Sequence, residues 1–234
     1  MVFFSSCRSV MFHHVFFNIF SLPNMSIHGR QAQTKRTKTF YDFCSASSGT
    51  LLCTDIAARD LDIPNVDCII QYDPPSDTKE YIHRVGRTTR GVGSCGNALL
   101  ILRPKVLEFL KYLEKAKVPV TELELKNTVK AQLQIEKLMS KKFWLRDSAK
   151  DAYESYLRAY NSHNLKDVFN VNTLNLAEVV KSIGFLAPPT NFPLITRSNC
   201  GNTSRSRKER VYEYSKDPPN APRRYQRANK FRKF

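Results

Sequence analysis

The stretch TLLCTDIAARDLDIPNVDCIIQYD (50–73) decides the predicted fold. It contains two short runs, TLLCTD (50–55) and DCIIQYD (67–73), that are mostly apolar on both faces. Strands have this composition when a parallel sheet is covered on both sides. Similar runs are MVFF (1–4), MSIH (25–28) and NALLIL (97–102), and helical spacing separates them at 8–20, 31–43, 78–84 and 104–116. Alternating strands and helices predict an α/β layer fold with right-handed crossovers.

The sequence pattern changes after Pro119. Residues 127–183 contain no proline and follow one helical pattern after another, with apolar residues at three- and four-residue steps. Asn175 is placed to cap a last helix over 176–183, and Gly184 is placed to end it. Because so short a stretch buries little surface alone, we expect this helical extension to pack against the α/β part.

The charge of the chain is concentrated at one end. Residues 197–234 carry twelve Lys or Arg and three acids, so 9 of the 16 net positive charges lie there. This segment lacks periodicity and cannot bury enough surface to fold. Such an excess of positive charge favours a polyanionic partner, usually a nucleic acid. The predicted organisation is an α/β domain over 1–120, a helical extension over 121–196 and a basic disordered tail over 197–234.

Cysteine and histidine usage gives no support for a metal site. The six cysteines lie far apart without a C-x-x-C pair, and the histidines do not cluster. Scattered thiols favour a reducing compartment over a disulfide scaffold. The apolar start over 1–20 lacks the basic region of a signal peptide. No window holds the roughly 18 uninterrupted apolar residues of a membrane span, so we expect no membrane association.

The stretch HRVGRTTRG (83–91) is the most informative motif. Arg87 and Arg90 stand three residues apart, so a helical turn would bring both guanidinium groups to one side. Guanidinium groups stay charged and bind phosphate oxygens in pairs, which suits a phosphate ligand. The plain alternative is a solvated basic helix face.

Two other stretches end a predicted strand and so lie where ligands of open α/β sheets bind. In TDIAARDLDIP (54–64), Asp62 could accept hydrogen bonds from ribose hydroxyls or could only cap the turn before Pro64. In IHGRQAQTKR (27–36), Gly29 allows close backbone approach and the following helix start favours phosphate. Gln33 and Arg36 share a face of that helix, although a plain amphipathic helix explains the pattern equally well.

In this order and spacing, VFFSSC (2–7), IHGRQAQTKR (27–36), CTDIAARDLDIP (53–64) and HRVGRTTRG (83–91) resemble the C-terminal motifs of DEAD-box RNA helicases. The resemblance covers residues 1 to about 116. QYDPP (71–75), EYIHRVGR (80–87), ALLILRP (98–104) and FNVNTLNLAEVVKSIGF (169–185) are similar to the nucleolar subfamily that acts in ribosome biogenesis.

The resemblance implies the second RecA-like domain of an ATP-dependent RNA helicase, with ATP held between two such domains and RNA crossing both. Arg87 and Arg90 would then be arginine fingers on the γ-phosphate, and His83 would couple the ATP state to the partner domain. These three residues form the implied catalytic set. The implied ATP contacts are Asp62, Arg59, Arg87 and Arg90, and the implied contacts to the RNA backbone are Gly29, Gln33, Arg36 and Thr54.

The sequence departs from the family pattern in three ways. It has no G-x-x-x-x-G-K-[ST] and no D-E-A-D, so we expect the first RecA-like domain to be absent and the chain alone to be inactive. We expect Mg²⁺ to be bound by that first domain and not by this chain. In the family, a strand and a helix precede the VFFSSC-like strand, whereas this sequence starts on that strand at Met1. Finally, Asp60 stands where the family has Gly, and its negative charge would oppose nucleotide phosphate.

Three functional hypotheses remain open. The chain is the C-terminal half of a helicase that acts on rRNA or pre-rRNA, a catalytically inactive module that binds RNA or pre-ribosomal particles, or an incomplete piece with no independent role. The resemblance implies a monomer located in the nucleus and nucleolus. An in-frame phosphate-binding loop and D-E-A-D directly upstream of Met1 would favour the first hypothesis.

Overall fold

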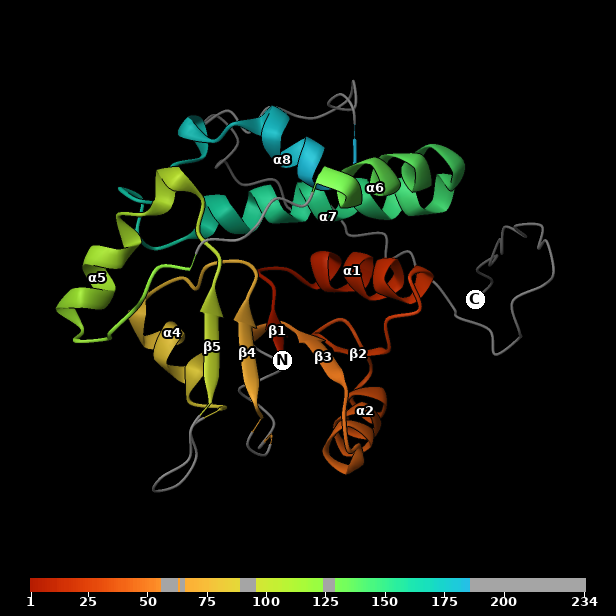
Figure 1. The fold of residues 1–234 in the computed structure, drawn as a ribbon, viewed down its shortest axis with the longest axis horizontal. Helices are drawn as coiled ribbons and strands as arrows, with labels where there is room; N and C mark the ends of the chain where they lie inside the picture. Colours follow the sequence, from red (N-terminus) through yellow and green to blue (C-terminus); the bar gives the residue numbers. More distant parts are fainter. Residues whose placement is uncertain (56–62, 64–65, 89–95, 124–128, 186–234) are drawn as a thin grey trace, which may run out of the picture. The chain divides into compact units, whose positions relative to one another are not determined.

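The computed structural model describes residues 1–55, 63, 66–88, 96–123 and 129–185 of the 234-residue chain. All of them belong to one compact unit. Its centre is a five-stranded parallel sheet with the order β2-β3-β1-β4-β5 (Figure 1). The strands are β1 (Val2–Phe3), β2 (Asn24–Ile27), β3 (Thr50–Cys53), β4 (Cys68–Gln71) and β5 (Asn97–Leu100). Each coincides with a predicted run, so the expected RecA-like sheet is confirmed.

Alternate residues of the central strands point to opposite faces of the sheet. Val2 and Phe4 pack with Val10 of helix α1 (Cys7–Ile19). On the other face, Phe3 and neighbouring strand residues pack against Phe40 of helix α2 (Gln33–Ser45). Because helices cover both faces, the strands can be apolar on both sides.

Two further helices complete the α/β part. Helix α4 (Thr78–Val85) follows β4 and begins at Asp77, whose carboxylate accepts a hydrogen bond from the Glu80 N–H at 2.8 Å. The predicted helix over 104–116 is divided into a 3₁₀-helix (Pro104–Val106) and α5 (Phe109–Lys115). The division follows from the tight turn at Leu107, whose N–H bonds to the Pro104 carbonyl three residues earlier.

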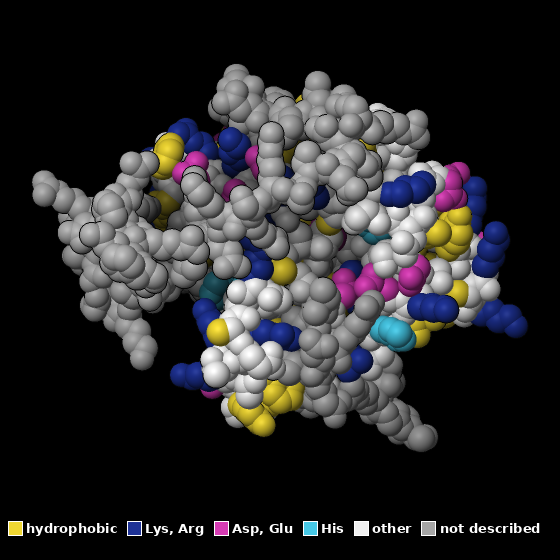
Figure 2. Space-filling model, turned by 180° about the vertical axis from the view of Figure 1, so that it is seen from behind, with side chains coloured by type: hydrophobic (Ala, Val, Ile, Leu, Met, Phe, Trp, Pro, Cys, Tyr) yellow, Lys and Arg dark blue, Asp and Glu magenta, His cyan; other side chains and the backbone are white. Residues whose placement is uncertain are grey.

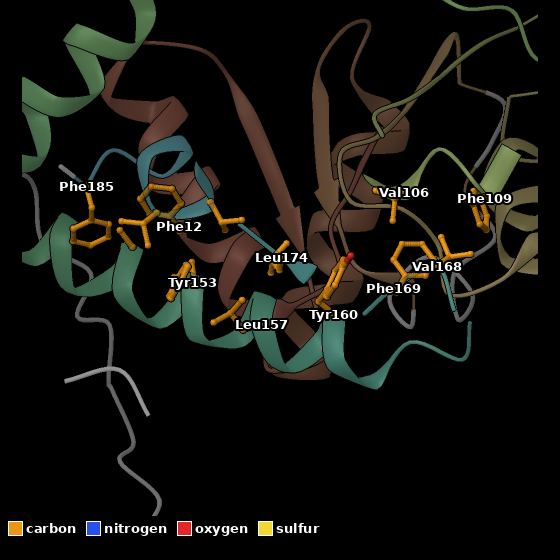
Figure 3. Packing of buried hydrophobic residues seen from close by; sticks show 14 of the residues in the cluster. Phe12, Val106, Phe109, Tyr153, Leu157, Tyr160, Val168, Phe169, Leu174 and Phe185 are labelled. Atoms are coloured by element: carbon orange, nitrogen blue, oxygen red, sulfur yellow. The ribbon is translucent and has the colours of Figure 1, made fainter. Parts of the chain in front are cut away.

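The extension consists of α6 (Val129–Lys141), α7 (Phe143–Ser162), a 3₁₀-helix (Val171–Thr173) and α8 (Leu176–Ser182). Its buried residues share one hydrophobic cluster with the α/β part. Figure 3 shows Tyr153 and Leu157 of α7 on the same side of that helix, facing Phe12 of α1 and Leu174. The extension therefore packs on the α/β part, as expected. The predicted boundary at residue 120 stays a prediction.

The ends of α8 are capped as the sequence predicts. The Asn175 side chain accepts a hydrogen bond from the Glu178 N–H at the start of the helix. At the end, Gly184 has a φ of 98°, its N–H bonds to the Lys181 carbonyl, and the Phe185 N–H bonds to the Val180 carbonyl. This pair of bonds is the Schellman motif, which favours glycine at the left-handed position.

No helix within the described ranges is long and apolar enough to cross a membrane. The predicted tail over 197–234 lies outside the described residues.

Candidate functional site

The carboxyl ends of four parallel strands meet at one edge of the sheet. Ser5 follows β1, His28 and Gly29 follow β2, and Thr54 follows β3. Asp73 lies two residues after β4. Ligands of open α/β sheets bind at this edge, where backbone and side chains from separate segments converge. This edge and helix α4 therefore form the candidate site.

The predicted RNA contacts come from two adjacent strands, β2 and β3. Ile27, the last residue of β2, and Cys53, the last residue of β3, are register partners. The segments that follow them, which contain Gly29 and Thr54, therefore leave the sheet side by side. Gly29 is exposed, and a Cβ built there would meet nothing within 4 Å, so the backbone at this turn is open to a ligand.

The start of α2 lies directly after this turn. The Arg36 guanidinium donates to the Gln33 side-chain oxygen at 3.0 Å, which confirms that the two share a helical face. The first turn of α2 contains no acid. A helix N-terminus flanked by cations favours an anion such as phosphate.

His28 shapes the same turn from within. Burial, and secondarily the charges of Lys35 and Arg30, lower the pKa of His28 to about 4, so its imidazole is neutral at pH 7. Its Nδ1 atom accepts a hydrogen bond from the Arg30 N–H at 3.3 Å. A neutral His28 therefore orders the loop before α2 without adding charge.

Thr54 stands out because its hydroxyl is buried without a partner. The residue is 7% exposed, and Oγ1 makes no hydrogen bond within the described part of the chain. Thr54 lines a pocket of about 270 Å³ together with Ser5, Asp55, Ser76, Glu80, Arg84, Ser162 and His163. A buried hydroxyl without a partner costs free energy, and Thr54 lines this pocket, so a ligand or water held there could supply the missing hydrogen bond.

His163 closes this pocket from the extension. It follows the last residue of α7, and its ring stacks on Phe169 with centroids 3.9 Å apart. Burial lowers the pKa of His163 to about 4, and its Nδ1 atom also lacks a hydrogen-bond partner within the described ranges. The sequence did not predict this residue, because nothing local relates it to Thr54.

Arg84 is the residue of the HRVGR motif that sequence reasoning did not assign. Its Nε and Nη2 atoms donate to the two carboxylate oxygens of Asp55 at 2.6 and 2.7 Å, and Nη1 donates to the Asp73 carbonyl at 2.8 Å. The side chain is only 3% exposed and lies over the Phe3 ring. Arg84 therefore ties α4 to the ends of β1, β3 and β4, and nothing local in the sequence distinguishes it from Arg87.

Asp73 is held on the other side of the same network. Burial raises the pKa of Asp73, while hydrogen bonds from the Ser5 N–H and hydroxyl, both 2.8 Å long, act against that shift. These bonds fix the end of β1 against the end of β4. The polar groups beneath the edge thus act as structural anchors.

His83 and Arg87 lie on α4 and the turn that follows it, four residues apart and facing one side. His83 is exposed and Arg87 is half-buried. Both line a hollow of about 460 Å³ with Asp77, Lys79 and Glu80. The structure therefore brings together two of the three predicted catalytic residues. Arg90, like the predicted ATP contacts Arg59 and Asp62, lies outside the described residues, as does Asp60.

Charge on the face seen in Figure 2 is mixed. Figure 2 shows the rear face of the described residues, where Lys and Arg side chains are spread widely while a group of acidic side chains lies beside a histidine. Within the described ranges, no three His, Cys, Asp or Glu side chains form a group that could hold a metal ion.

Comparisons with known proteins define the class. Residues 1–92 match the helicase conserved C-terminal domain, and residues 144–191 match the C-terminal extension described as ATP-dependent rRNA helicase SPB4-like. The chain is 62% identical over 191 residues to the probable ATP-dependent RNA helicase pitchoune of Drosophila melanogaster, and 59% identical to the human ATP-dependent RNA helicase DDX18. Each match covers 81% of this chain but only 28% of the relative.

A solved structure agrees with the sequence comparison. The second domain of the DEAD-box helicase Mss116p, bound to an RNA duplex, matches with a TM-score of 0.65 and 29% identity over 78% of this chain and 72% of that one. The chain is therefore a helicase C-terminal domain with an extension. It belongs to the DEAD-box RNA helicases and corresponds to their C-terminal part, of the type found in DDX18 and HAS1.

Proposed function

We propose that this chain is the half of an ATP-dependent RNA helicase that holds the RNA backbone and completes the ATP site from one side. The observation that carries the proposal is the unpartnered Thr54 hydroxyl at the carboxyl end of β3, the strand paired with β2, which leads through Gly29 to the acid-free first turn of α2. Hydroxyls, glycine backbone and helix N-termini suit sugar–phosphate groups, which contain no sequence information. Gly29, Gln33, Arg36 and Thr54 are the proposed contacts.

ATP is the proposed cofactor, and the residues of α4 fit one side of it. Arg87 would hold the γ-phosphate together with Arg90, and His83 would lie at the boundary with the partner domain. Asp62 and Arg59 would contact the ribose and the domain interface. An arginine finger is worth roughly 10³–10⁵ in rate in phosphoryl transfer, but it acts on phosphates that another loop already cradles. This sequence has no such loop. The Mg²⁺ that accompanies ATP would be held by the first RecA-like domain, which carries that loop.

Coupling between the two ligands follows from the buried network. Thr54 contacts RNA in this proposal, and its neighbour Asp55 forms the ion pair with Arg84. Arg84 in turn lies between His83 and Arg87 in the chain, on the helix that faces ATP. One rigid link therefore joins the proposed RNA and ATP contacts, so closing the ATP site would fix the position of the RNA strand.

The biological setting is proposed from the relatives. The extension resembles that of rRNA helicases, which supports rRNA or pre-rRNA as the substrate and pre-ribosomal particles as partners. We also propose that the protein is located in the nucleus and nucleolus and that it acts as a monomer. A binding module without catalysis is the second candidate, because the proposed RNA contacts all lie within this chain.

RNA binding with Thr54→Val tests the proposal, because valine keeps the shape and removes the hydroxyl. We expect fluorescence anisotropy with a labelled single-stranded RNA to report weak, sequence-independent binding that falls steeply with salt. Thr54→Val should weaken binding by roughly fivefold, the value of about one hydrogen bond. The matched control is Thr50→Val at the other end of the same strand, which should leave affinity unchanged.

Two outcomes would contradict the proposal. One is an absence of RNA binding by the folded chain, and the other is an equal loss of affinity in the Thr54 and Thr50 variants. Removal of residues 197–234 should flatten the salt dependence, since 12 of the 37 Lys and Arg leave with them.

A further inference from the structure

Two adjacent aromatic side chains are exposed where α6 ends and α7 begins. Lys141 is the last residue of α6 and Phe143 is the first of α7. Phe143 is 66% exposed and Trp144 is 51% exposed, whereas the next residue, Leu145, is fully buried. The inner face of α7 is thus occupied by Leu145. Phe143 and Trp144 contribute little to the core, and we call them the aromatic step.

Cations surround the aromatic step. The Lys142 ammonium lies 5.6 Å from the centre of the Trp144 ring, and the Arg146 guanidinium lies 5.1 Å from the centre of the Phe143 ring. Residues 137–150 contain five Lys or Arg and one acid. The first turn of the 20-residue helix α7 contains no acid, so the helix dipole adds to the positive potential there. The local charge is therefore complementary to an anion.

Aromatic rings beside cations suit one class of ligand in particular. Single-stranded nucleic acids stack their bases on aromatic side chains while their phosphates lie against Lys and Arg. A duplex cannot make this contact along its length, because its bases already stack on one another. An aromatic side chain accepts any base, so such a surface is tolerant of sequence.

We propose that the aromatic step binds an unpaired segment of RNA. Bases stack on Trp144 and Phe143, and the flanking phosphates pair with Lys141, Lys142 and Arg146. This site lies on the extension and shares no residue with the carboxyl edge of the sheet. It goes beyond the proposed function, since it gives the extension its own preference for single-stranded RNA.

The single tryptophan of the chain makes the proposal directly measurable. Trp144 is the only tryptophan among the 234 residues, so fluorescence excited selectively in tryptophan, and not in the ten tyrosines, reports on the aromatic step alone. We expect a short oligoadenylate RNA to quench this fluorescence in a saturable manner. The same strand in a blunt duplex should quench it far less. Inorganic polyphosphate should leave it nearly unchanged, because it supplies charge without bases.

Substitutions separate stacking from folding. Phe143→Leu with Trp144→Leu keeps apolar bulk on an exposed helix turn and removes both rings. This pair should weaken binding of labelled single-stranded RNA by roughly tenfold, the effect of losing about one stacked base. Phe20→Leu, at another exposed aromatic position, is the control and should leave affinity unchanged. An unchanged thermal midpoint in all variants would show that folding is intact.

The outcomes distinguish this proposal from the proposed function. If Thr54→Val weakens RNA binding while RNA leaves Trp144 fluorescence unchanged, the aromatic step does not bind RNA and the carboxyl edge does. A blue shift of Trp144 on vesicles of phosphatidylcholine and phosphatidylserine, without quenching by RNA, would overturn the proposal in favour of a membrane surface. Equal quenching by single-stranded RNA and duplex would overturn the preference for unpaired bases.

Discussion

The carboxyl edge of the sheet and the aromatic step hold their functional side chains in opposite ways. At the edge, Arg84, Asp55 and Asp73 form a buried polar network that fixes the strand ends. At the aromatic step, Phe143 and Trp144 stand in solvent on a helix whose other face forms the core. The first arrangement positions a ligand precisely, whereas the second offers a tolerant surface. Mutations at the edge should therefore alter both stability and binding, and mutations at the step should alter binding alone.

The largest effect should follow from removing Arg84. Arg84→Met leaves the Asp55 carboxylate without its bidentate partner in a mostly buried position, which should lower the free energy of unfolding by roughly 3 kcal/mol. Urea denaturation measures this change. Arg87→Met is the matched control in the same motif, and we expect it to cost less than about 1 kcal/mol because Arg87 is half-buried. Equal losses in both variants would contradict the distinct roles assigned to the two arginines.

Gly184→Ala should produce the next largest effect, and it acts on α6, the helix that ends next to the aromatic step. The new Cβ would lie 2.4 Å from Ile135 Cγ2 and 3.0 Å from Met139 Cγ, both on α6, at a residue with a φ of 98°. Steric overlap and left-handed strain together should lower the free energy of unfolding by about 2 kcal/mol. Gly49→Ala, where a Cβ meets nothing within 4 Å, is the control. A tolerated Gly184→Ala would show that α6 and α8 are not packed as described.

A smaller effect should appear in the pH dependence of stability. Burial lowers the pKa of His13 to about 4, so the unfolded chain, with an ordinary value of 6.5, takes up the proton first as pH falls. The contribution of neutral His13 is present above pH 6.5 and is lost between 6.5 and about 4. His13→Phe keeps a ring among Phe4, Phe12 and Tyr72 but removes this titration.

Unfolding measured at neutral pH and near pH 5 tests this directly. The drop in unfolding free energy should be smaller in His13→Phe than in the parent chain by about 1–2 kcal/mol. Asp73, whose pKa is raised by burial, acts in the opposite direction, but it is present in both proteins and so cancels in the difference. An identical pH dependence in the two proteins would contradict a buried neutral His13.

Much of the fold could be predicted from local pattern. The five apolar runs became the five strands, and Asn175 and Gly184 mark the ends of α8 as expected. The pairing of Gln33 with Arg36 also follows from helical spacing. These features depend on residues a few positions apart, where the chain itself fixes the geometry.

The rest depends on contacts between distant segments. Arg84 and Arg87 have the same chemistry in one motif, and it is the contact with Asp55, 29 residues away, that makes Arg84 a buried anchor. His163 comes to the pocket of Thr54 from the far end of α7. The exposure of the aromatic step could not be predicted either. In the sequence, Phe143 and Trp144 fit a helical apolar pattern and look no different from residues that will be buried. Burial of one neighbour and not the other is decided by packing.

ATP turnover with and without the first RecA-like domain tests the central claim most directly. The chain should be measured alone and joined behind that domain from a relative such as pitchoune, in each case with and without RNA. We predict no turnover by the chain alone, RNA-stimulated turnover by the joined protein, and a loss of roughly 10³-fold or more in the joined Arg87→Ala variant. Turnover by the chain alone that Arg87→Ala abolishes, or a joined protein indifferent to Arg87, would contradict the account.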